Sequence, residues 1–126
     1  MQGHAPPVLY AAELTGCRLL ANLQPESVSR AFVDALTGAG ATVVQQLAHQ
    51  FPGAGQTCVL ILAESHAVLH TWPETGTVNL DIFSCSARLK CEAAIAALGD
   101  AFGATTVSTQ EVLRADGHRP PSDGRA

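Results

Sequence analysis

Apolar and polar positions alternate along much of the chain, which is typical of strands with one buried face. The clearest example sets Val78, Leu80 and Ile82 against Asn79 and Asp81. Alternating or short apolar runs predict six strands, over residues 8–15, 41–49, 57–63, 66–72, 77–83 and 105–113. A turn over residues 73–76 separates the fourth strand from the fifth, which predicts a hairpin there.

Two further stretches have helical spacing. The first helix is expected to begin at Pro25, which suits the first helical position, and to end at Gly38-Ala39-Gly40. Its apolar residues are Val28, Phe32, Val33 and Leu36. Residues 87–102 predict a second helix, with Ser84 or Ser86 as its N-cap.

The expected order is therefore β-α-β-β-β-β-α-β over a single domain, residues 1–126. This order predicts an α+β fold in which a mostly antiparallel sheet carries two helices on one face. The other face then needs a cover, and we expect a sheet-to-sheet or edge dimer. Residues 1–7 are expected to be loose, and the polar tail over residues 114–126 is expected to be disordered.

Composition excludes some classes of partner. The 126 residues carry a net charge of −4 without a basic cluster, so we expect no nucleic acid partner. No apolar run approaches the ~20 residues of a membrane span, and the N-terminus lacks the pattern of a signal peptide. We therefore expect a cytoplasmic protein. Its four cysteines form no Cys-x-x-Cys pair and are expected to be free thiols.

Reactive side chains gather in residues 64–74, directly after the apolar run of residues 58–63. One interpretation is a zinc site on His66 and His70. On a strand, residues four apart lie ~13 Å from each other, whereas zinc ligands lie about 2 Å from the metal, so we expect no metal. A second interpretation is a hydrolase triad of Ser65, His70 and Asp81, but the Gly-x-Ser-x-Gly motif is absent.

The third interpretation comes from a resemblance. The sequence Glu-Ser-His-x-x-x-His-Thr-Trp-Pro-Glu over residues 64–74, followed by Asp81-x-Phe83-x-Cys85, resembles the short prokaryotic S-adenosylmethionine decarboxylases. His49-x-Phe51 and Gly55 fit the same pattern at unshifted spacing. These are pyruvoyl-dependent enzymes of polyamine and spermidine biosynthesis, made as self-cleaving proenzymes. The likeness extends more faintly from about residue 10 to residue 112.

The resemblance implies cleavage between Glu64 and Ser65, giving a β chain of residues 1–64 and an α chain of residues 65–126. Ser65 would become the pyruvoyl cofactor, whose ketone forms a Schiff base with the substrate and accepts electrons during decarboxylation. The implied route is attack of the Ser65 hydroxyl on the Glu64 carbonyl, elimination of the resulting ester, and hydrolysis that releases ammonia. No external cofactor is implied.

The resemblance also implies roles for other residues. His70 would accept the Ser65 Hα during processing, and Cys85 would be the acid that protonates the substrate carbon. Thr57 stands where the family has a serine that supports processing. Phe51 and His70 match residues that stack on adenine, and Glu74 matches one that binds the ribose hydroxyls. The family's active sites lie at the interface of a homodimer.

The predicted hairpin gives an independent test of these positions. If its strands pair about the turn, partners sum to roughly 149 or 150, and Cys85 lies opposite Glu64 or Ser65 with Cβ atoms ~5 Å apart. On a straight strand, however, His70 lies ~16 Å from Ser65. Either the chain bends after Ser65, or His70 reaches the serine of a second subunit, which is the interpretation we favour.

Two alternatives remain open from the sequence. A pyruvoyl enzyme of this type could decarboxylate arginine or ornithine, because only the groups beyond the α-carbon would differ. A homologue with the same fold could also remain uncut and act only as a binding protein.

Overall fold

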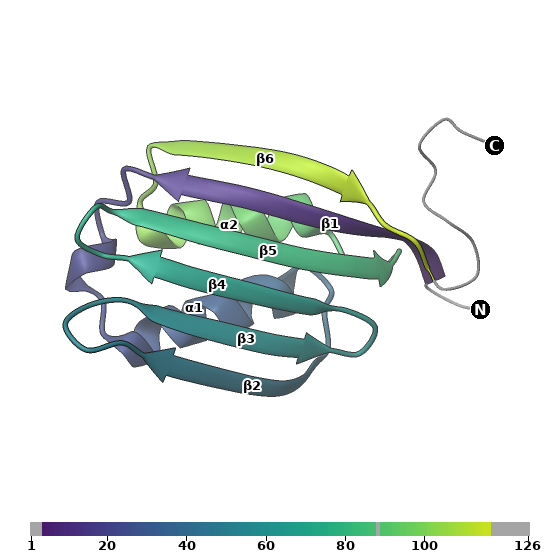
Figure 1. The fold of residues 1–126 in the computed structure, drawn as a ribbon, viewed down its shortest axis with the longest axis horizontal. Helices are drawn as coiled ribbons and strands as arrows, with labels where there is room; N and C mark the ends of the chain where they lie inside the picture. The colour runs from purple at the N-terminus through teal and green to yellow at the C-terminus, as the bar shows by residue number, and fades with distance from the viewer. Residues whose placement is uncertain (1–3, 88, 117–126) are drawn as a thin grey trace.

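The structure, a computed structural model, describes residues 4–87 and 89–116. It is an antiparallel sheet with two helices packed on one face (Figure 1). The strands are β1 (His4–Thr15), β2 (Val43–Gln50), β3 (Gln56–Leu62), β4 (His66–Trp72), β5 (Thr77–Ser86) and β6 (Thr106–Leu113). The helices are α1 (Pro25–Gly38), α2 (Cys91–Phe102) and a short 3₁₀ helix, η1 (Leu20–Asn22). The predicted α+β class and element order are confirmed.

The six strands lie in the order β2-β3-β4-β5-β1-β6, with β2 and β6 at the edges. Consecutive strands from β2 to β5 are neighbours, joined by short turns. The N-terminal strand β1 instead lies between β5 and β6, so the first and the last strand pair with each other (Figure 1). The pairing of β1 with β5 places β1 beside the hairpin formed by β4 and β5.

One face of the sheet packs on the helices, where Phe32 of α1 and Phe102 of α2 are fully buried. In β4, Ala67, Leu69 and Thr71 point into this core. The alternate positions form the uncovered side, which we call the open face. Across β2 to β5 its residues are Gln45, Leu47, His49, Thr57, Val59, Ile61, His66, Val68, His70, Trp72, Thr77, Asn79, Asp81, Phe83 and Cys85.

The predicted N-cap of the second helix is wrong. Ser84 and Ser86 belong to β5, which is longer than expected because it continues to pair with β1, and α2 begins only at Cys91. Its N-cap is Lys90, which makes no side-chain capping bond. The Lys90 amide instead donates to the carbonyl of Ala39, just after α1. Contacts between distant segments therefore override a favourable local capping signal.

The two ends of the chain also differ from expectation. Residues 4–7 belong to β1 and are not loose, because this segment pairs with the end of β5. The short helix η1 was not expected from the sequence pattern. The expected disordered tail lies outside the described residues except for residues 114–116. Within the part of the chain that the structure describes, no helix is long and apolar enough to cross a membrane.

Candidate active site

Ser65 lies at the end of the tight turn between β3 and β4. The turn is closed by a hydrogen bond from the Leu62 amide to the Ser65 carbonyl, 2.9 Å long. Glu64 is exposed within the turn and Ser65 is half-buried. The expected cleavage bond is therefore part of a compact turn that leads into a straight strand.

Cys85 lies across from this turn on β5. His66 pairs with Phe83 and Trp72 with Thr77, so partners sum to 149, as predicted. The Cys85 thiol donates to the Glu64 carbonyl oxygen at 2.5 Å, and the Cys85 amide donates to Ser65 Oγ at 3.4 Å. Glu64, Ser65 and Cys85 form what we call the Ser65 cluster. It combines a hydroxyl, a carbonyl and a thiol on one chain.

A second group of functional candidates lies toward the other end of β4. His70 contacts Phe51 and Trp72, with ring centroids 5.5 and 4.6 Å apart, and His49 packs against Phe51 at 4.8 Å. We call His49, Phe51, His70 and Trp72 the aromatic cluster. Thr57 Oγ1 lies 2.7 Å from His70 Nδ1. The hydroxyl and the two rings restrict the orientation of the imidazole.

Phe51 reaches His70 because of the loop between β2 and β3. The Phe51 amide donates to the Gly55 carbonyl at 3.0 Å, which closes the loop. Gly55 has φ +92°, and a Cβ atom there would lie 2.8 Å from the Thr71 carbonyl oxygen. Only glycine allows the loop to approach β4 this closely. Glu74, exposed in the turn after β4, lies two residues beyond Trp72.

The Ser65 cluster and the aromatic cluster are at opposite ends of β4. The pairing of β4 with β3 and with β5 is regular throughout, so the strand does not bend between them. At ~3.3 Å per residue, His70 lies ~16 Å along the strand from Ser65. One chain therefore does not bring His70 to Ser65. The triad of Ser65, His70 and Asp81 is likewise not assembled.

Two polar residues that the sequence analysis did not select lie beside the aromatic cluster. The indole N–H of Trp72 donates to Asn79 Oδ1 at 2.7 Å, and Asn79 Nδ2 donates to Glu13 Oε1. The alternation in β5 places Asn79 on the open face. Nothing local in the sequence signals Glu13, because β1 pairs with β5 across more than sixty intervening residues.

Cys85 differs from the three other cysteines, all of which are free and buried. Burial raises the pKa of Cys91 to about 11 and also raises the pKa of Cys17, so both thiols stay protonated near neutral pH. Cys58 lies on the core side, 3.2 Å from the Gln56 side-chain nitrogen. Cys85 is the cysteine whose thiol reaches the turn at Ser65.

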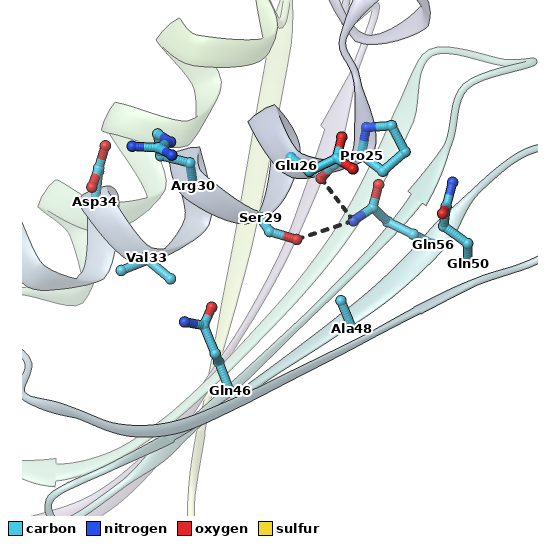
Figure 2. Close-up of a pocket in the computed structure, with 10 residues that line it drawn as sticks. All are labelled: Pro25, Glu26, Ser29, Arg30, Val33, Asp34, Gln46, Ala48, Gln50 and Gln56. Carbon is cyan, nitrogen blue, oxygen red and sulfur yellow. Dashed lines mark hydrogen bonds between the residues drawn. The ribbon is translucent and has the colours of Figure 1, made fainter.

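A cleft of about 480 Å³ opens on the other side of the sheet, between α1 and strands β2 and β3 (Figure 2). At one end, the buried side chain of Gln56 donates to the Pro25 carbonyl and to Ser29 Oγ, both at 3.3 Å. These bonds tie the start of β3 to α1, and Thr57 follows on the open face. The cleft itself contacts neither cluster.

Among the described residues, no group of three or more side chains is placed to hold a metal ion.

Comparison with known proteins identifies the family. A family model described as S-adenosylmethionine decarboxylase matches residues 9–115, most of the chain and both clusters. The chain belongs to the S-adenosylmethionine decarboxylase family. Membership agrees with the resemblance seen in residues 64–85.

Individual family members are moderately similar. The S-adenosylmethionine decarboxylase proenzyme of Clostridium tetani is 35% identical over 103 residues, which cover 82% of each protein. The proenzyme of Acidithiobacillus ferrooxidans is 41% identical over 87 residues, 69% of this chain and just under two thirds (65%) of that protein. The crystal structure of the adenosylmethionine decarboxylase from Aquifex aeolicus VF5 has the same fold, with a TM-score of 0.77, 22% identity and 98% of both chains covered.

Proposed function

We propose that the chain is a self-processing, pyruvoyl-dependent decarboxylase. It converts S-adenosylmethionine to decarboxylated S-adenosylmethionine, the aminopropyl donor for spermidine and other polyamines. The observation that carries the proposal is the Ser65 cluster, in which the Cys85 thiol contacts the Glu64 carbonyl next to the Ser65 hydroxyl. Family membership supports it. The expected location is the cytoplasm, where free thiols stay reduced.

Processing begins at the bond between Glu64 and Ser65. Ser65 Oγ attacks the Glu64 carbonyl carbon, a C–O bond forms, and the C–N bond breaks to give an ester and a free amine. Negative charge develops on the carbonyl oxygen during the attack. The Cys85 S–H already donates to this oxygen and stabilises the charge.

The second stage needs a base. His70 removes the Ser65 Hα, the Glu64 carboxylate leaves, and hydrolysis of the resulting enamine releases ammonia. A histidine suits this task because its ordinary pKa is near neutrality. In the active tautomer the Nδ1–H group donates to Thr57 Oγ1, which leaves Nε2 as the nitrogen that accepts the proton.

The resulting pyruvoyl group at residue 65 supplies a ketone that binds the substrate amine and withdraws electrons as carbon dioxide leaves. The chain's own residues do the remaining work. Cys85, across from residue 65, delivers a proton to the substrate α-carbon. Phe51 and His70 stack on the adenine ring, and Glu74 accepts hydrogen bonds from the ribose hydroxyls.

A homodimer brings the two clusters together. The open face exposes large apolar side chains, among them Leu47 and Ile61, that a second sheet can cover. A two-fold axis between two stacked sheets, perpendicular to the strands, turns one sheet end for end. The Ser65 cluster of each chain then meets the aromatic cluster of its partner, which gives two identical active sites.

The two alternatives lead to different results. An arginine or ornithine decarboxylase would also be cut at Ser65. Its substrate carries no aromatic ring, however, so the aromatic cluster would have nothing to stack on. An uncut binding homologue would keep residue 65 as an ordinary serine. The aromatic cluster favours S-adenosylmethionine.

Denaturing mass spectrometry of freshly folded protein tests the proposal. We expect the 13.1 kDa chain to give two fragments, residues 1–64 and 65–126, the second with a carbonyl-reactive, blocked N-terminus. Ser65→Ala is the control and should remain intact. Release of labelled carbon dioxide from S-adenosylmethionine, arginine and ornithine then identifies the substrate. A wild-type chain that stays whole after prolonged incubation would refute the enzymatic function.

A further inference from the structure

A row of hydrogen bonds joins Trp72, Asn79 and Glu13, and we call these three residues the relay. These residues come from three neighbouring strands, β4, β5 and β1. We infer that Asn79 and Glu13 are positioning residues that hold the Trp72 indole as a wall of the substrate site. In this role they select a substrate bearing an adenine ring. The inference rests on the proposed function and deepens its substrate choice.

The chemistry of the three groups fixes the direction of both bonds. An indole N–H can only donate, so the Asn79 atom that faces Trp72 must be the amide oxygen. The NH₂ group then points the other way, toward Glu13. An ionised carboxylate can only accept, so it holds the amide in this orientation. Glu13 thereby acts on Trp72 through Asn79.

Trp72 needs such a constraint because little else holds it. It is the last residue of β4, and 43% of its surface is exposed. Its ring contacts His70 at 4.6 Å with planes 50° apart, and His70 in turn contacts Phe51. Rotation of the indole would therefore alter the shape of the aromatic cluster.

A group of aromatic faces of this kind suits a flat heteroaromatic ring. Stacking is favourable for adenine, whereas the aliphatic chains of arginine and ornithine have no ring to offer. An oriented Trp72 would raise the affinity for the adenine-bearing substrate. The chemical step at Ser65 would not depend on it directly. The relay should therefore affect KM more than kcat.

The decisive experiment exchanges the donor and the acceptor between positions 79 and 13 in two steps. Asn79→Asp keeps an acceptor for Trp72 but sets a carboxylate against Glu13, and we expect KM for S-adenosylmethionine to rise about tenfold, with kcat within about twofold. Adding Glu13→Gln restores an N–H donor between the two positions and returns the net charge to its original value. We expect this double variant to recover most of the wild-type KM.

The single tryptophan supplies a second measurement. We expect 5′-methylthioadenosine, which carries adenine without the amino acid, to quench Trp72 fluorescence in the wild-type protein. The quenching should need about tenfold more ligand in Asn79→Asp and return in the double variant. Gln110→Glu is the matched control, because it adds the same charge on the same face of the neighbouring strand β6 but pairs with Ala11 rather than with Glu13. It should leave KM and quenching unchanged.

The outcomes separate this inference from the proposed function. If wild-type protein stays uncut or releases no carbon dioxide, the proposed function is wrong. If wild-type protein decarboxylates S-adenosylmethionine while Asn79→Asp keeps its KM and quenching, the relay is wrong. The relay is also overturned if the double variant is no better than Asn79→Asp, or if Gln110→Glu has the same effect. Circular dichroism confirms that each variant is folded.

Discussion

At the scale of single residues, the proposed chemistry depends on which nitrogen of His70 is free. The Thr57 hydroxyl lies 2.7 Å from Nδ1, and Phe51 and Trp72 pack against the ring. These contacts fix the position and the orientation of the imidazole without burying it. Thr57 can do this because β3 and β4 pair with Thr57 directly opposite His70.

Removing the Thr57 hydroxyl should therefore slow processing. Thr57→Val has nearly the same shape but no hydrogen bond to offer, and the loss of about 1–2 kcal/mol of orientation should slow cleavage by about tenfold. Thr57→Ser keeps the hydroxyl and should cut at close to the wild-type rate. The measurement is the fraction of cut chain against time on denaturing gels. Equal rates for Thr57→Val and wild type would remove Thr57 from the mechanism.

The candidate site residues came from the resemblance, and local pairing allowed the position of one of them to be checked. Counting across a short hairpin places Cys85 opposite Glu64, and the structure confirms that position. Glu13 could not be found in this way, because its partner Asn79 lies sixty-six residues away along the chain. Its role depends on β1 inserting between β5 and β6, which no local pattern specifies.

At the scale of elements, the loop between β2 and β3 determines where Phe51 lies. The loop returns onto β4 at Gly55, whose missing side chain leaves room for the Thr71 carbonyl. Thr71 also accepts a hydrogen bond from the Gln56 amide through its hydroxyl, at 3.0 Å. Loop and strand are thus joined beside the aromatic cluster.

Gly55→Ala tests this junction. It combines a positive φ with a Cβ 2.8 Å from backbone, so we expect a loss of about 2–3 kcal/mol in the free energy of unfolding. Gly53→Ala is the control, because Gly53 has nearly the same φ, +91°, but nothing within 4 Å, and it should cost only about 1 kcal/mol. Urea unfolding in a Ser65→Ala background keeps the chain whole during the measurement. Equal losses for the two variants would show that the close approach at Gly55 is unimportant.

At the scale of the whole molecule, the two faces of the sheet have different roles. The helix side holds the core, which alternation in the sequence predicts well, for example at Val78, Leu80 and Ile82. The open face carries the candidate chemistry and remains uncovered in one chain. The sequence predicted this uncovered face and the separation of Ser65 and His70 on a straight strand. It left open whether the chain bends after Ser65, which the regular pairing along β4 excludes.

Shared active sites would explain that separation, and mixed dimers test the idea. Ser65→Ala chains cannot be cut but still supply His70, whereas His70→Ala chains keep Ser65 but lack the base. Each variant alone should stay whole. When the two are co-expressed and associate at random, about half of the His70→Ala chains have a Ser65→Ala partner, and only these should be cut. Mass spectrometry distinguishes the two chains.

A charge placed on the open face provides the control. Val59→Lys in both variants should prevent the sheets from stacking and abolish cleavage. The cross-strand partners of Val59 are the apolar Leu47 and Val68, so the buried ammonium would be unpaired and costly. If mixed dimers form, as judged by native mass spectrometry, and the His70→Ala chain remains uncut, His70 does not act across the interface. Cleavage that persists with Val59→Lys would instead show that the open face is not where the two chains meet.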